Sequence, residues 1–181
     1  MNRKEKAGRE QLVDLCLAAF VESGTIDLSL DHLASRVGIS KRMLVHHFGG
    51  RETIEEKAMT RLEEKLRAQF APDSFPPGVS PKAVVGALWE RTTAPEARGV
   101  LLLIMDLSKR AWSGSARAKA FYEEQQRLWV KLLRKFLPDQ TAVEELLQLF
   151  QGAVLAYLIT GDRDRGRRAL MRILSRKRNT R

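Results

Sequence analysis

Apolar residues recur at helical spacing along almost the whole chain. No segment alternates between apolar and polar residues at the period of two that a half-buried strand requires. In the first helical segment, for example, Leu12, Cys16, Ala19 and Phe20 share one side. Glycine and proline mark the ends of most segments, because glycine tolerates the left-handed conformation and proline cannot continue a helix. The sequence therefore predicts an all-α protein.

Capping serines and helix-ending glycines divide the N-terminal third into short helices. Ser29 and Ser40 each precede a helical segment, where a hydroxyl accepts a hydrogen bond from the free N–H groups of the first turn. Gly38 separates these two segments, and Gly49-Gly50 ends the second of them. The predicted helices of this third cover residues 9–22, 30–37, 40–48 and 51–70.

A proline-rich stretch, Ala71–Gly78, interrupts the helical pattern and is the best domain boundary in the chain. Ser80-Pro81 then starts another helix, with a capping hydroxyl and a first-turn proline in their preferred places. Later breaks outline about five helices beyond the linker. We therefore expect an N-terminal domain of residues 1–50 with a connecting helix 51–70, a linker 71–79 and a second domain 80–181.

The chain is strongly basic, with a formal net charge of +10 and a pI near 10.2. Such an excess of positive charge is typical of proteins that bind polyanions. The excess is unevenly placed, because residues 1–70 hold 12 Lys/Arg against 11 Asp/Glu, whereas residues 71–181 hold 20 against 11. The C-terminal stretch 162–181 alone has nine Arg/Lys and two Asp. That stretch is a solvated helix face, an additional phosphate contact or the site of an acidic partner.

The segment Ser29–Phe48 has the proportions of a helix-turn-helix unit, whose second helix lies in the DNA major groove. On a wheel of its second helix, Leu44 and Phe48 face the preceding helices, while the opposite side carries Lys41 and Arg42 near the N-terminus. Solvation alone would explain an isolated Lys-Arg pair, but this pair lies within the complete pattern. The sequence therefore predicts that the segment binds DNA.

The predicted contacts divide by chemistry. Arg42 can donate two hydrogen bonds to guanine O6 and N7, whereas Lys41 and Arg51 would pair with phosphates. Hydroxyls and N–H groups at the helix starts also suit phosphate. The residues predicted to contact DNA are Ser29, Ser40, Lys41, Arg42, Met43, Val45, His46, His47 and Arg51.

Residues 9–66 resemble the N-terminal domain of the TetR family of bacterial transcriptional regulators. The resemblance rests on Leu17-Ala18-Ala19-Phe20, Glu22-Ser23-Gly24, residues 29–34, Val37-Gly38-Ile39-Ser40-Lys41 and Leu44-Val45-His46-His47-Phe48. Val45 stands where the family commonly has a tyrosine that donates its hydroxyl to phosphate. Valine cannot donate, but it can contact a thymine methyl group.

The resemblance implies that residues 79–178 form a regulatory domain that binds a small molecule and makes a homodimer. Aromatic residues at helical spacing are also typical of an ordinary core, so both interpretations stay open. The residues predicted to line a ligand pocket are Trp89, Met105, Trp112, Phe121, Tyr122, Trp129, Phe150 and Tyr157. The residues predicted at a dimer interface, on the last two helices, are Gly152, Ala153, Ala156, Leu170, Ile173 and Leu174.

The sequence thus predicts a transcriptional regulator, most simply a repressor that a small molecule releases from a palindromic operator. The alternative is a DNA-binding regulator whose C-terminal domain binds a protein partner and senses no small molecule. No nucleophile with a nearby base and no phosphate-cradling glycine loop appears, so an enzyme is not expected. Neither a metal nor a cofactor is expected. A single cysteine, the polar N-terminus and the lack of a long apolar run predict a cytoplasmic chain outside the membrane.

Overall fold

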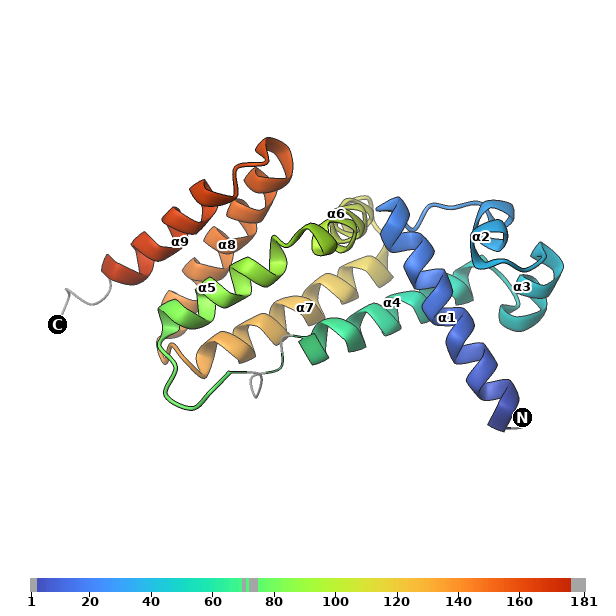
Figure 1. The fold of residues 1–181 in the computed structure, drawn as a ribbon, viewed down its shortest axis with the longest axis horizontal. Helices are drawn as coiled ribbons and strands as arrows, with labels where there is room; N and C mark the ends of the chain where they lie inside the picture. Colours follow the sequence, from blue (N-terminus) through green and yellow to red (C-terminus); the bar gives the residue numbers. More distant parts are fainter. Residues whose placement is uncertain (1–2, 70, 72–74, 177–181) are drawn as a thin grey trace. The chain divides into compact units, whose positions relative to one another are not determined.

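The computed structural model describes residues 3–69, 71 and 75–176, and all regular secondary structure within them is helical (Figure 1). The elements are α1 (Arg3–Ser23), α2 (Leu30–Val37), α3 (Lys41–Phe48), α4 (Arg51–Gln69), α5 (Pro81–Thr92), the 3-10 helix η2 (Pro95–Ala97), α6 (Arg98–Trp112), α7 (Ala116–Arg134), α8 (Gln140–Thr160) and α9 (Arg163–Arg176). The predicted all-α fold class is confirmed, as are the five α-helices predicted after the linker. Phe70, residues 72–74 of the predicted linker and residues 177–181 of the basic stretch lie outside the described residues.

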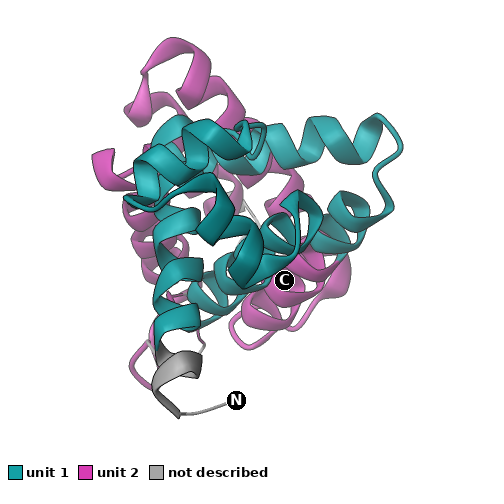
Figure 2. Cartoon of the chain, turned by 90° about the vertical axis from the view of Figure 1, so that its right-hand side faces the viewer, with its two compact units in different colours: residues 1–68, 99–123 teal, residues 69–98, 124–181 magenta. Residues whose placement is uncertain are grey.

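The described residues group into two compact units, each built from two separate segments of the chain (Figure 2). Unit 1 combines residues 1–68 with residues 99–123. Unit 2 combines residues 69–98 with residues 124–181. The helix-turn-helix segment therefore shares a unit with α6 and with the first half of α7.

This division differs from the predicted one, which placed all of residues 80–181 in a single domain. The physical reason lies in the apolar side of α6 and the start of α7. Leu103, Leu107 and Phe121 are buried in the same hydrophobic cluster as the side chains of α1–α4. Removing this apolar surface from water joins the later segment to the N-terminal helices.

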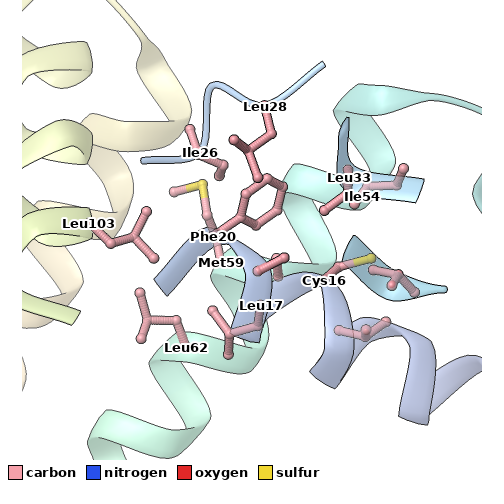
Figure 3. Close-up of a cluster of buried hydrophobic side chains, with 14 of the residues drawn as sticks. Cys16, Leu17, Phe20, Ile26, Leu28, Leu33, Ile54, Met59, Leu62 and Leu103 are labelled. Carbon is pink, nitrogen blue, oxygen red and sulfur yellow. The ribbon is translucent and has the colours of Figure 1, made fainter. Parts of the chain in front are cut away.

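The core of unit 1 centres on α1, whose inner side meets α2, α4 and α6 (Figure 3). Phe20 is 2% exposed, and Leu33 of α2 and Ile54 of α4 are equally well covered. Cys16 is fully buried beside them, and burial raises the pKa of its thiol to about 11. Because the thiolate is the reactive form, Cys16 is an inert core residue at neutral pH, as its place in the apolar stripe indicated.

The core of unit 2 centres on Trp89 of α5, which is fully buried. α9 packs against both α5 and α8, and its Leu170 is fully buried. Gly166 of α9 lies directly against the indole ring, so that a Cβ atom at this position would overlap the ring and would also lie 3.3 Å from the Cβ of Ala153 on α8. The close approach of these three helices therefore depends on a glycine at position 166.

Among the described helices, α8 alone is long and apolar enough to cross a membrane by length and composition, with a mean hydropathy of 1.4 over its best window. Of that window, 39% is buried inside the structure. A core helix of a soluble protein meets the same criteria, so this is weak evidence for a membrane span.

We predict opposite effects when alanine replaces two helical glycines of unit 2. Gly166→Ala should lower the free energy of unfolding by about 1–3 kcal/mol, because the added methyl group overpacks against Trp89. Gly86→Ala on α5 has open space around its Cβ position and should raise stability by about 0.5–1 kcal/mol through helix propensity. Urea denaturation of both variants measures the difference. Equal stabilisation by the two substitutions would contradict the close packing at Gly166.

Candidate nucleic-acid interface

Two serine caps and a glycine turn define the helix-turn-helix segment. The Ser29 hydroxyl accepts a hydrogen bond from the N–H of His32 at 3.1 Å, and the Ser40 hydroxyl accepts one from the N–H of Met43 at 3.2 Å. Gly38 ends α2 in the left-handed conformation with φ of 81°, which glycine adopts without steric cost. The sequence predicted both caps and the turn because these signals are local.

α3 has a buried side and an exposed side. Leu44 is fully buried and Phe48 is 3% exposed, so this side is fixed in the core of unit 1. The side chains on the other side are exposed, and His47 lies between the two sides with intermediate exposure. The exposed residues of α3 are Lys41, Arg42, Met43, Val45 and His46. The structure therefore divides α3 as the helical wheel predicted.

The cations of this surface differ in whether they have an acidic partner. Lys41 Nζ lies 2.9 Å from Asp31 Oδ2 on the first turn of α2. Arg51, the first residue of α4, donates from Nη2 to Asp27 Oδ1 at 2.5 Å and from Nε to Glu55 Oε1 at 2.6 Å. Arg42 has no acidic partner among the residues that the structure describes. The guanidinium predicted to read bases is thus unpaired, whereas the cations predicted to bind phosphate are paired.

The contacts of Arg51 alter the ionisation of the groups involved. The hydrogen bond from Arg51 lowers the pKa of the Asp27 carboxyl, and the positive charges of Arg51 and Arg110 add to the effect. Hydrogen bonds to Glu55 and then to Asp27 raise the pKa of Arg51. Both groups are therefore charged throughout the physiological pH range, and the pair persists as an ion pair.

α6 holds the segment between α1 and α2 in place. Asp106 Oδ2 accepts hydrogen bonds from the Thr25 hydroxyl at 2.9 Å and from the N–H of Ile26 at 3.1 Å. Arg110, one turn along α6, donates from Nε to the same oxygen at 3.3 Å and places Nη2 3.7 Å from Asp27 Oδ1. α6 therefore fixes the segment that carries Asp27. No local pattern predicts this contact, because the partners are about eighty residues apart in the chain.

The two histidines of α3 are adjacent in sequence, and their rings lie close together. The rings of His46 and His47 are 5.7 Å apart between centroids, in an edge-on arrangement. Within the described part of the chain, no three His, Cys, Asp or Glu side chains are grouped so that they could hold a metal ion.

The eight predicted pocket residues are divided equally between the two compact units. Met105, Trp112, Phe121 and Tyr122 belong to unit 1, where Trp112 is 89% exposed while Phe121 is part of the core. Because the Trp112 side chain is so exposed, it does not line a pocket within unit 1.

The other four predicted pocket residues form an aromatic cluster in unit 2. The Trp89 ring lies 5.7 Å from Phe150 and 6.4 Å from Tyr157, and Trp129 lies 5.6 Å from Phe150, measured between centroids. The indole N–H of Trp89 is buried and has no hydrogen-bond partner among the described residues. A separate hollow of about 380 Å³ lies between residues 75–79 and residues 135–136, and sequence reasoning missed it.

The predicted dimer residues occupy different environments. Leu170 is fully buried in unit 2 and Ala153 is 8% exposed, so these two serve the core of their own unit. Ala156, Ile173 and Leu174 have intermediate exposure.

The outer side of α8 instead carries apolar residues that sequence reasoning did not name. Leu155 is 48% exposed and Ile159 is 75% exposed, and the predicted residue Gly152 is exposed on the same side of the helix. The available signal was the apolar character of α8 all round its second half, because a helix without a polar side must cover both sides.

Comparison with solved structures identifies the fold. A TetR-family transcriptional regulator from Streptomyces coelicolor is 20% identical and aligns with a TM-score of 0.73, covering 96% of this chain and 80% of that chain. A TetR-like regulator from Rhodococcus is 19% identical with a TM-score of 0.63, covering 96% and 97%. The chain has the TetR-family fold. The resemblance predicted from residues 9–66 is therefore confirmed for the fold of the whole chain.

The curated sequence relatives are HTH-type transcriptional regulators, and no family model matches the chain. TtgW of Pseudomonas putida, named an uncharacterized HTH-type transcriptional regulator, is 27% identical over 95 residues, which is 51% of this chain and 69% of TtgW. SrpR of the same species is 27% identical over 92 residues, half of this chain and 42% of SrpR. BetI of Escherichia coli is 28% identical over 165 residues, covering 84% and 78%. The sequence relatives are therefore named as HTH-type transcriptional regulators, and the solved structures share the TetR-family fold.

Proposed function

We propose that this TetR-fold protein is a sequence-specific regulator that inserts α3 into the major groove of its operator. The observation that carries the proposal is that α3 has one buried side and one exposed side. Leu44 and Phe48 fix the helix in the core, and the exposed side presents Lys41 and Arg42 at its N-terminal end. The N-terminal residues of a recognition helix usually meet the base edges.

Each exposed side chain of α3 suits a different part of the DNA. Arg42, which has no acidic partner in the described chain, can donate two parallel hydrogen bonds to guanine. Lys41, the first residue of α3, and Arg51, just beyond the end of α3, suit backbone phosphates. Met43 is 44% exposed and Val45 is 36% exposed, and both can contact thymine methyl groups. The interface would thus combine one strong polar contact to a base with apolar contacts.

The functional form in this proposal is a homodimer that binds a palindromic operator. Two recognition helices about 34–36 Å apart can read half-sites one helical turn apart on the same face of the DNA. The exposed apolar side of α8, formed by Gly152, Leu155 and Ile159, supports pairing with a second copy. Small and apolar residues of this kind allow close approach of two helices and bury surface that is otherwise exposed to water.

The proposal includes a small-molecule effector that releases the protein from DNA, so that the protein acts as a repressor. The aromatic cluster around Trp89 in unit 2 supports it, because the buried indole N–H has no partner and could donate to a ligand atom. An effector that prefers one shape of the dimer would shift its population and lower the affinity for the operator. Binding to chromosomal DNA would place the protein in the cytoplasm.

One observation favours the alternative, in which the C-terminal region binds a protein partner and senses no small molecule. Trp112, at the end of α6, is 89% exposed. Tryptophan is enriched at protein interfaces, where its burial contributes a large share of the binding free energy.

The roles of Arg42 and Lys41 can be separated by DNA binding. We expect Arg42→Ala to lose about 1–3 kcal/mol on the preferred site and to relax the preference at one base pair. Lys41→Ala should weaken binding to all sequences alike and reduce the slope of log affinity against log salt by about one. Titration of preferred and unrelated duplexes at several salt concentrations measures both effects. Lys119→Ala on α7, which removes the same charge elsewhere in unit 1, is the control, and equal sequence-blind losses in both α3 variants would contradict the assignment.

The proposed dimer can be tested by substitutions on α8. Ile159→Glu should shift the protein to monomers and lower operator affinity at least tenfold, because it places a charge in the apolar contact between copies. Thr141→Glu, at the exposed start of the same helix, should leave both properties unchanged. Analytical ultracentrifugation and DNA titration make the comparison, and an Ile159→Glu dimer with normal affinity would show that this side of α8 is not the interface.

The effector proposal predicts stabilisation by ligand. A thermal-shift screen should find small molecules that raise the melting temperature of the wild-type protein, by mass action, and that dissociate it from DNA. Trp89→Phe, which removes the indole N–H while keeping an aromatic ring, should weaken that response. If no compound stabilises the protein but Trp112→Ala abolishes a stable protein complex, the alternative holds instead.

A further inference from the structure

We propose that Asp31 and Asp27 act as internal counter-ions of the DNA-binding surface, which lower its affinity for phosphate while leaving the base-reading arginine free. The inference rests on the proposed function, since it concerns the regulation of the same surface. It assigns a role to two carboxylates that no DNA contact requires.

The first pair lies at the start of α3. Lys41 is the first residue of the helix, and its Nζ atom lies 2.9 Å from Asp31 Oδ2. Both side chains are more than half exposed, with relative exposures of 53% and 70%. The pair is therefore open to solvent on the same side of the segment that would face DNA, and a phosphate that approaches Lys41 must approach Asp31 as well.

The second pair lies just beyond the end of α3. Arg51 follows Gly49-Gly50 and donates to Asp27 at 2.5 Å. Asp27 belongs to the segment that Asp106 of α6 holds through Thr25 and Ile26, so its carboxylate has an anchored position. The lowered pKa of the Asp27 carboxyl agrees with a persistent ion pair.

The two carboxylates are selective in what they neutralise. Asp31 pairs with Lys41 at the start of α3, and Asp27 pairs with Arg51 beyond its end and also lies 3.7 Å from Arg110 of α6. Neither carboxylate pairs with Arg42, which suits guanine. Phosphate contacts supply the sequence-independent part of DNA affinity, and base contacts supply the preference for one sequence. Carboxylates placed in this way reduce the sequence-independent affinity for DNA and leave the preference for one sequence intact.

The mechanism is competition between carboxylate and phosphate for the same ammonium or guanidinium group. In the free protein each cation is already partly neutralised, so fewer counter-ions leave the DNA when the complex forms. The slope of log affinity against log salt should therefore be smaller than the number of cations alone would give. This property distinguishes an electrostatic role of Asp31 from a purely structural one.

The test is Asp31→Asn, which keeps the shape of an exposed side chain and removes its charge. We expect the variant to bind the selected operator and unrelated duplexes about two- to fivefold more tightly at moderate salt, as loss of an exposed ion pair allows. The salt slope should steepen by a fraction of one unit, because Lys41 is partly neutralised in the wild type and no longer so in the variant. Thermal unfolding of the free protein verifies that the variant is folded.

Two comparisons isolate the pair. In a Lys41→Ala background, Asp31→Asn should give little further gain, because the cation that it neutralises is gone, and a double-mutant cycle measures this coupling. Glu123→Gln on α7 makes the same change in net charge elsewhere in unit 1 and should leave affinity and slope almost unchanged. Asp27→Asn, alone and with Arg51→Gln, repeats the cycle at the other end of α3.

The outcomes separate the inference from the function on which it rests. Normal wild-type binding together with an unchanged salt slope in Asp31→Asn and in Asp27→Asn would overturn the counter-ion role alone. A gain of equal size in Glu123→Gln, or in the Lys41→Ala background, would overturn it too, because the effect would then be general electrostatics. If neither the wild type nor any variant prefers a DNA sequence, the proposed function fails and the inference fails with it.

Discussion

The burial of one side of α3 is the constraint on which the candidate DNA-binding surface depends. Leu44 and Phe48 lie in a core that α1, α2, α4 and α6 share, and this fixes the rotation of a helix of only eight residues. So short a helix is marginal by itself in water, and packing supplies most of its stability. The exposed side of α3, and hence the direction of Arg42, follows from that packing.

α6 adds a second constraint, because it belongs to the same unit as the helix-turn-helix segment. Its apolar side enters the shared core, and its polar residues Asp106 and Arg110 hold the segment that leads into α2. Asp27 lies at the end of this chain of contacts and pairs with Arg51. The position of one predicted phosphate contact therefore depends on a helix that is distant in sequence.

The electrostatics of the surface follow from these placements more than from net charge. The basic excess of the chain lies mainly beyond residue 70, and the helix-turn-helix segment carries acidic residues within reach of its cations. Binding by such a surface depends on a few placed groups and on their partners. In the proposed complex, Val45, in the place where the family commonly has a tyrosine, adds an apolar contact rather than a hydrogen bond, so that DNA recognition relies still more on Arg42.

The sequence by itself determined the helices, the caps at Ser29 and Ser40, the turn at Gly38 and the two sides of α3. These features depend on residues within about four positions of one another, so the local pattern contains them. Only the tertiary structure decided that α6 joins the N-terminal unit, that Leu170 is core and that Leu155 and Ile159 are exposed. It also decided that Lys41 pairs with Asp31 and Arg51 with Asp27. Such contacts join residues far apart in the chain, and no local pattern records which distant surface will cover an apolar side or neutralise a charge.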